Sequence, residues 1–97
     1  MFNIATQSER LTCTFPERMD TLACEKYQAQ ITAQVSQTGL PVTFDLAGVG
    51  YVASSFIRIC LRAAQAVGRD HFDMINVAPE VKKVFKIAGL DHQLNIR

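Results

Sequence analysis

The sequence has no tryptophan, only three cysteines and only two histidines. The cysteines are odd in number and lack the C-x-x-C spacing, and the histidines have no neighbour at the spacing of a metal site. The residues concerned are Cys13, Cys24, Cys60, His71 and His92. We therefore expect free thiols, no metal centre and no cofactor.

The sequence also lacks long apolar runs and a large net charge. No apolar stretch approaches the roughly 20 residues that span a bilayer, and the opening segment MFNIATQSERLTCTF has no basic region followed by an apolar run of signal-peptide length. This pattern predicts a cytoplasmic protein without membrane insertion. Ten Lys and Arg against nine Asp and Glu leave a formal net charge of +1, which argues against nucleic acid as a partner.

The composition is that of an ordinary globular protein. Hydrophobic residues make up 48% of the chain and charged residues 20%, which are not the proportions of a disordered chain. A chain of 97 residues has room for a single hydrophobic core. We therefore expect one domain that spans residues 1–97.

Residue spacing indicates the elements of the amino-terminal half. Period-two alternation predicts a hairpin, with strands at 1–5 and 11–15 around a polar turn at 7–10. Apolar residues three and four apart then predict a helix at about 21–37, which Gly39 ends. A β-branched and aromatic run at 42–46 predicts a buried strand.

The carboxyl-terminal half continues the alternation of strands and helices. After Tyr51 and Val52, an apolar row from Phe56 to Val67 predicts a second helix that ends at Gly68. A strand at 72–77, a third helix that begins at Pro79 and a short last strand follow. Four residues of the third helix are expected to face the core, namely Val81, Val84, Phe85 and Ala88. Leu94 and Ile96 are expected to close the sheet as the last strand.

The predicted order of elements is β-β-α-β-α-β-α-β. Strands that alternate with helices are joined by right-handed crossovers and lie parallel. The expected fold is therefore α/β, a mixed, mostly parallel sheet of four to five strands with three helices and a hairpin at one edge. Partners of such folds bind where strands end and helices begin, which directs attention to residues 52–56.

Ser54 and Ser55 stand at that junction, and two interpretations are open. A serine at the start of a helix can cap it by accepting hydrogen bonds from unpaired amides of the first turn. Alternatively the serine is a phosphoacceptor, because a helix amino terminus favours the negative charge that phosphorylation adds.

A polar stripe runs along the second helix. At 100° per residue one narrow face carries Ser55, Arg58, Arg62, Gln65 and Arg69. Ile57 and Leu61 flank this face and are expected to be partly exposed. Arginines beside an apolar margin suit a partner interface, and a solvated helix face is the alternative.

The remaining polar residues do not form a catalytic set. Asp20 and Thr21 precede the first helix as a cap or as partner contacts, and Asp45 ends a strand without a base, nucleophile or metal beside it. We therefore do not expect an enzyme. Two further groups are interpreted as a solvated turn and a solubilising helix face, namely Asp70, His71 and Asp73, then Lys82, Lys83 and Lys86.

The run VTFDLAGVGYVASSFIRICLRAAQAVG, followed by FDMINVAPEVKKVFKIAGLDHQLNI, resembles the STAS family, the domain of anti-sigma factor antagonists and of sulfate transporter tails. The family's Asp-Ser-Ser-Gly-Leu motif corresponds to residues 53–57, with Ala53 in place of the aspartate and Phe56 in place of the glycine. A later segment, from Val77 through Pro79 and Phe85 to Gly89-Leu90, is similar to a second family pattern.

This resemblance implies a regulatory, signalling role. In the family an anti-sigma factor that is itself a kinase phosphorylates the first serine of the motif, and the unphosphorylated protein binds that kinase and frees the sigma factor. By resemblance Ser54 is the phosphoacceptor, Ser55 is the alternative, and the bulky Phe56 is expected to crowd the approach of a kinase loop. The partner-binding residues would be Asp20, Thr21, Ala53, Ser54, Ser55, Ile57, Arg58, Leu61 and Arg62.

A second function is also compatible with the resemblance. Small STAS proteins bind the ATPase of phospholipid-trafficking ABC transporters, and in that setting the altered serine motif would carry no penalty. Both functions predict a protein partner, and the first places it at the Ser54 junction and the second helix.

Overall fold

A computed structural model describes residues 2–97 of the chain. Its elements are β1 (Asn3–Gln7), β2 (Arg10–Thr14), β3 (Arg18–Met19), α1 (Thr21–Thr38), β4 (Val42–Asp45), β5 (Tyr51–Val52), α2 (Ser54–Val67), the 3₁₀ turn η1 (Arg69–His71), β6 (Phe72–Ile75) and α3 (Pro79–Ile87). The predicted hairpin, the three helices and the strands at 42–46 and 72–77 are confirmed, with ends that shift by a few residues. Met1 of the predicted first strand lies outside the described residues.

The main sheet has four strands in the order β1-β2-β4-β6. β1 and β2 form an antiparallel hairpin at one edge, whereas β2 pairs with β4 and β4 with β6 in parallel. The mixed, mostly parallel α/β fold is therefore confirmed. A separate two-stranded sheet joins β3 and β5, also in parallel.

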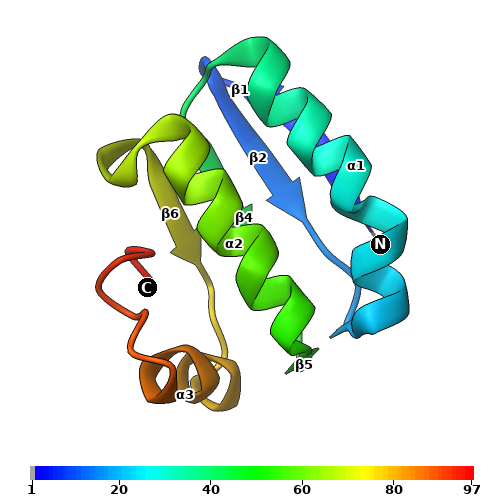
Figure 1. Ribbon diagram of the computed structural model, residues 1–97, viewed down its shortest axis with the longest axis vertical. Coiled ribbons are helices and arrows are strands. Elements are labelled where there is room, and N and C mark those ends of the chain that lie inside the picture. The colour runs from blue at the N-terminus through cyan, green and yellow to red at the C-terminus, as the bar shows by residue number, and fades with distance from the viewer. Residues whose placement is uncertain (1) are drawn as a thin grey trace.

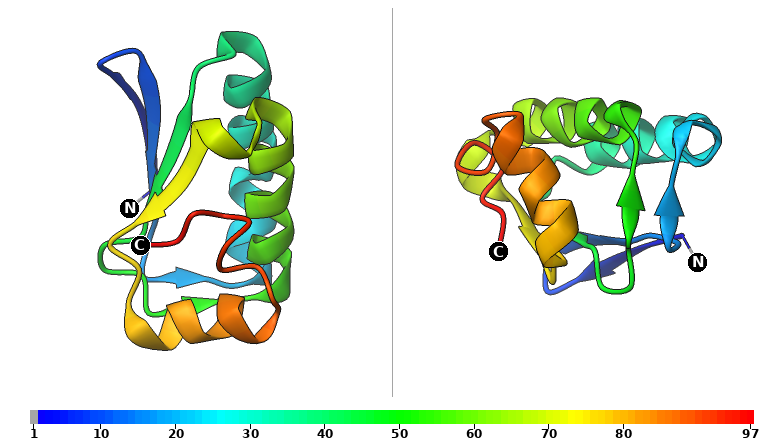
Figure 2. Two further views of the ribbon diagram at one scale, coloured as in Figure 1. Left: turned by 90° about the vertical axis from the view of Figure 1, so that its left-hand side faces the viewer. Right: turned by 90° about the horizontal axis from the view of Figure 1, so that it is seen from below.

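The helices lie on one side and at one end of the sheet. α1 and α2 run side by side over the same face, and α3 lies across the end at which the parallel strands finish (Figure 1 and Figure 2). The amino termini of α1 and α2 and the β3–β5 pair are at this same end. The fold therefore brings three strand-to-helix junctions together.

Local sequence sets the ends of α1. The Asp20 side chain accepts a hydrogen bond from the Ala23 amide, which satisfies one free donor of the first turn. Gly39 adopts a left-handed conformation with φ of 63° and its amide donates to the Val35 carbonyl, the arrangement in which glycine ends helices at low cost.

Several expectations for the carboxyl-terminal part are wrong. Leu94 and Ile96 do not form a strand, because only a single parallel bridge joins Ile96 to Met74 of β6. Val84 is 39% exposed and Ala88 is also exposed, so the buried face of α3 consists of Val81 and Phe85. A nine-residue helix that crosses the end of the sheet touches the core with a narrower stripe than one that lies along it.

Phenylalanine rings form the centre of the core. Phe56 is fully buried and its ring packs edge-on against Phe15 at a centroid distance of 5.1 Å. Phe44 lies at 6.2 Å and Phe85 at 6.5 Å from the same ring. Phe56 thus joins α2 to the sheet and to α3, and the expectation that it crowds the surface near Ser54 is wrong.

The three cysteines are free and buried. Burial raises the pKa of the Cys13 thiol to about 12 and raises that of Cys60 well above its usual value, because a buried thiolate lacks solvation. Within residues 2–97, no helix combines the length and apolar composition needed to cross a membrane.

Replacing Phe56 by alanine should lower the free energy of unfolding by about 3–5 kcal/mol, because it removes a ring from the centre of the core. Urea denaturation followed by circular dichroism measures this loss. Ile57→Ala, at a half-buried position on the same turn, should cost clearly less. Equal losses in the two variants would show that Phe56 is not central.

Candidate partner-docking site

The β3–β5 pair fixes the backbone from which α2 begins. Arg18 pairs with Tyr51 and Met19 with Val52, and the pairing continues as the Ala53 amide donates to the Met19 carbonyl at 2.9 Å. At the other end of the pair the Gly50 amide donates to the Glu17 carbonyl at 2.9 Å. The segment before Ser54 is therefore held to the segment before α1.

Neither serine caps α2, so the capping interpretation is wrong. The N-cap residue is Ala53, in an extended conformation and without a side-chain acceptor. Ser54 is the first helical residue and is exposed. The amino terminus of α2 therefore has no side-chain cap for its first amides, and an exposed hydroxyl stands beside them.

Ser55 has a different environment. Its Oγ is buried and has no hydrogen-bond partner among the described residues. The nearby Cys24 thiol donates a long hydrogen bond of 3.8 Å to the Met19 carbonyl instead. The pKa of the Cys24 thiol is raised, mainly by burial. The nearby Ser55 hydroxyl lowers this pKa and the Asp20 carboxylate raises it, both to a smaller extent. Ser55 and Cys24 are near each other but do not reach hydrogen-bond geometry.

Asp20 and Thr21 lie at the start of α1. The Asp20 Oδ1 accepts from the Ala23 amide at 3.0 Å, so its predicted role as a cap is confirmed. Its Oδ2 lies 3.9 Å from Nε of Arg18 in an exposed pair. Thr21 is exposed. Asp20 is thus a structural residue, and its partner-binding role and that of Thr21 stay predictions.

The arginine stripe of α2 is present in part. Arg58 and Arg62 are exposed, while Ile57 and Leu61 beside them are half-buried, as expected. Neither arginine has an ion pair or a side-chain hydrogen bond with the described residues. Arg69 lies in η1, beyond the end of the helix, and its Nη2 donates to the His92 carbonyl, so the predicted stripe ends before it.

Three exposed residues at the same end were not predicted from the sequence. Leu22, in the first turn of α1, is 76% exposed, and Tyr51 is 45% exposed. The Arg18 guanidinium stacks over the Tyr51 ring at 4.5 Å from its centroid. A strand of two residues is too short to show period-two alternation, so no pattern in the sequence indicated these residues.

Two further aspartates, Asp45 and Asp73, have structural surroundings. Asp45 Oδ1 accepts from the Ala47 amide and from Asn76 Nδ2, both at 3.0 Å. Asp73 does not lie in a solvated turn as predicted, because it is part of β6. Its Oδ1 accepts a 2.6 Å hydrogen bond from the hydroxyl of Thr43, which in turn accepts from Arg10.

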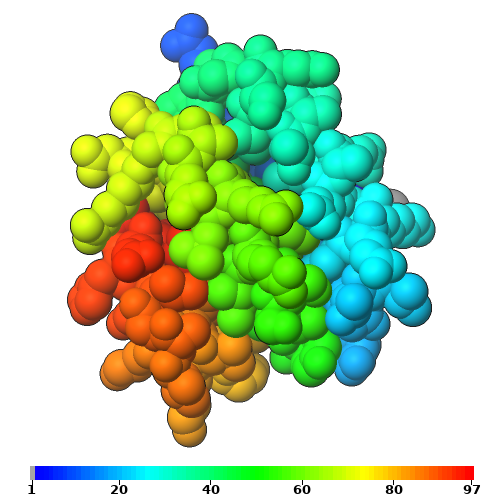
Figure 3. Space-filling view, viewed as in Figure 1, coloured from blue at the N-terminus to red at the C-terminus, as the bar shows by residue number. Residues whose placement is uncertain are grey.

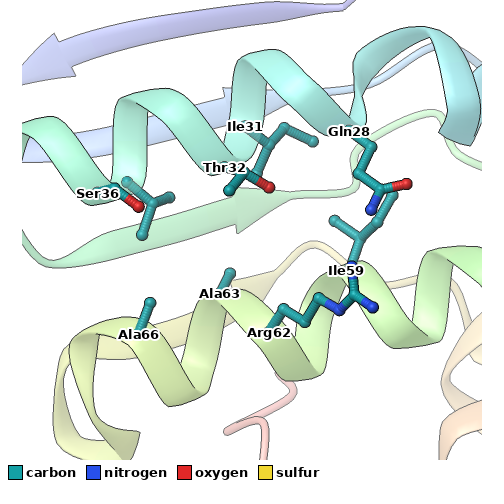
Figure 4. A pocket seen from close by; sticks show the side chains of 9 residues that line it. Gln28, Ile31, Thr32, Ser36, Ile59, Arg62, Ala63 and Ala66 are labelled. Carbon is teal, nitrogen blue, oxygen red and sulfur yellow. The ribbon is translucent and has the colours of Figure 1, made fainter.

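A shallow groove separates α1 from α2. Apolar side chains of Ile31, Val35, Ile59 and Ala63 line much of it, and Gln28 and Arg62 extend toward each other at one end (Figure 4). Figure 3 views the face on which the two helices lie side by side. No group of three or more ligating side chains within residues 2–97 is placed to hold a metal ion.

Comparisons place this architecture among known folds. No protein-family model matches the sequence, and no curated protein matches it. A STAS domain protein from Planctomyces limnophilus superposes with a TM-score of 0.84 at 22% identity, over 99% of this chain and 87% of that one. The protein has the STAS fold.

Other structures with the STAS fold agree with this assignment. An anti-sigma factor antagonist from Mycobacterium paratuberculosis gives a TM-score of 0.86 at 16% identity, over 99% of this chain and 83% of that one. SpoIIAA of Bacillus in its phosphorylated form gives 0.72 at 19% identity, over 100% and 91%. The fold expected from the sequence motifs is confirmed, and the roles of individual residues rest on the geometry of this chain.

Replacing Asp20 by alanine should lower the free energy of unfolding by about 1 kcal/mol, because the Ala23 amide loses its acceptor. Asp20→Asn should retain most of this energy, since its side-chain oxygen can still accept. Thermal unfolding of the three proteins tests the assignment. Equal losses in both variants would show that the charge beside Arg18, and not the cap, stabilises this end.

Proposed function

We propose that this STAS domain, spanning residues 1–97, is a regulatory protein-binding module of the anti-sigma factor antagonist type. It acts in the cytoplasm, catalyses no reaction itself, and binds an anti-sigma factor that is also a serine kinase, with Ser54 as the phosphoacceptor. The observation that carries the proposal is the exposed Ser54 hydroxyl at the uncapped start of α2. The likeness to antagonists of known structure supports it.

Ser54 is favoured over Ser55 because of access. A kinase must bring the γ-phosphorus of ATP into line with the attacking oxygen, and ADP leaves as the serine proton passes to a kinase base. The Ser54 side chain is open to solvent, whereas Oγ of Ser55 is buried. Phe56 does not obstruct the approach, because its side chain lies wholly in the core.

The surface around Ser54 suits a protein partner. Leu22 and Tyr51 provide exposed apolar area, and Ile57 and Leu61 provide a half-buried margin along α2. Arg58 and Arg62 provide charge that no carboxylate of the described residues pairs. Aromatic and arginine side chains around an apolar centre are characteristic of interfaces.

Phosphorylation would act as a switch at this surface. A phosphate brings about −1.5 to −2 charges, and a charge buried without a partner in an interface costs several kcal/mol. In the free protein the same phosphate would be stabilised by the amides and dipole at the start of α2. Modification therefore favours the separated protein over the complex.

Incubation with a candidate kinase encoded nearby in the genome and ATP should add one phosphate at Ser54, as read by mass spectrometry. Ser54→Ala should abolish the modification and Ser55→Ala should leave it. Modification of Ser55 alone would contradict the assignment. If the protein stays unmodified and co-purifies with a transporter ATPase, the proposal is wrong. The second function, a subunit of a phospholipid-trafficking ABC system, would then take its place.

Reversing charge at Arg58 and Arg62 with glutamate should leave the fold intact but weaken partner binding by about tenfold or more, because both side chains are exposed on the docking face. A pull-down with the identified partner measures the loss. The double variant Lys82→Glu, Lys83→Glu makes the same charge change on α3 and serves as the control. Unchanged binding in the arginine variant would exclude α2 from the interface.

A further inference from the structure

Four polar side chains converge on one depression where the groove between α1 and α2 reaches the first turns of α2. Gln28 comes from α1, and Ser55, Arg58 and Arg62 come from α2, with Ile59 as the apolar floor. The depression has a volume of about 60 Å³, which exceeds the ~10–15 Å³ that one water needs. It contains two cationic side chains and no carboxylate.

The side chains present an excess of hydrogen-bond donors. Two guanidiniums, one amide and one hydroxyl line the depression, and neither arginine is paired to a carboxylate of the described residues. Ser55 borders the depression, but its Oγ is buried and is not a donor open to a docking group. The accessible donors are therefore the two guanidiniums and the Gln28 amide.

We propose that Gln28, Arg58 and Arg62 form an oxyanion site that receives an acidic side chain of the partner protein. This rests on the proposed function, in which a protein docks on this face. Arginines recognise carboxylates through paired hydrogen bonds, and positions 58 and 62 lie one helical turn apart on the same face. Charge complementarity therefore specifies a glutamate or aspartate as the occupant.

The test titrates isotope-labelled protein with a blocked tetraglutamate peptide at constant ionic strength. The Nε–H signals of Arg58 and Arg62 and the amide of Ser55 should shift and saturate. A blocked tetraglutamine peptide should produce no such shifts. The double variant Arg58→Gln, Arg62→Gln should weaken binding by about tenfold or more, whereas Lys82→Gln, Lys83→Gln, which removes the same charge elsewhere, should not.

Gln28→Ala separates a built site from general electrostatic attraction. It keeps both arginines and should still weaken binding of the peptide, because the Gln28 amide is a donor to the carboxylate. An unchanged affinity in this variant, or shifts that fail to saturate, would overturn the proposal. Inorganic phosphate is titrated in parallel, and tighter binding of phosphate than of the peptide would also overturn it in favour of a free small oxyanion.

These titrations are independent of the kinase. They use neither ATP nor a partner, so the oxyanion site can be disproved while Ser54 is phosphorylated normally. Conversely, the peptide can bind as expected while the kinase leaves Ser54 unmodified. Failure of one proposal is therefore distinguishable from failure of the other.

Discussion

The parallel pairing of two short strands, β3 and β5, is the constraint on which the candidate site depends. Each strand has only two residues, yet each leads directly into a long helix. Because Ala53 also donates to the Met19 carbonyl, the entries to α1 and α2 are held at a fixed separation. The exposed Ser54, the Tyr51 ring and Leu22 are consequently presented together, although 32 positions separate Leu22 from Ser54 in the sequence.

The packing of the core explains why the large Phe56 side chain leaves the surface beside Ser54 exposed. Position 56 carries a phenylalanine, and such a large side chain would obstruct the surface beside Ser54 if it pointed outward. Helical geometry turns it inward instead, two positions beyond the exposed Ser54, where Phe15, Phe44 and Phe85 surround it. Phe56 therefore attaches α2 to the sheet, and the adjacent surface stays open.

Periodicity predicted the elements that bury a regular face and failed where tertiary contacts decide. α2 was predictable because Phe56, Cys60 and Ala63 recur at helical spacing and face the sheet. β3 was not, because two residues cannot show alternation and pair only with a strand more than thirty positions away. The sequence also could not show that Ser54 is exposed while the Ser55 hydroxyl is buried. Adjacent helical positions differ by 100°, and the packing of the neighbouring helix decides which hydroxyl is covered.

The spacing of Ser54 and Arg58 connects the two proposals physically. Residues four apart on a helix are neighbours on its surface, so a phosphate on Ser54 would lie within reach of the Arg58 guanidinium and could pair with it. Arg58 would then be neutralised within the chain and withdrawn from an acidic side chain of the partner. The remaining phosphate charge would repel that side chain, because charges closer together than the ~8 Å Debye length are only partly screened. Phosphorylation would thus oppose docking in two ways, by occupying a donor and by reversing the local charge, and the arginine pair would determine how strongly the switch acts.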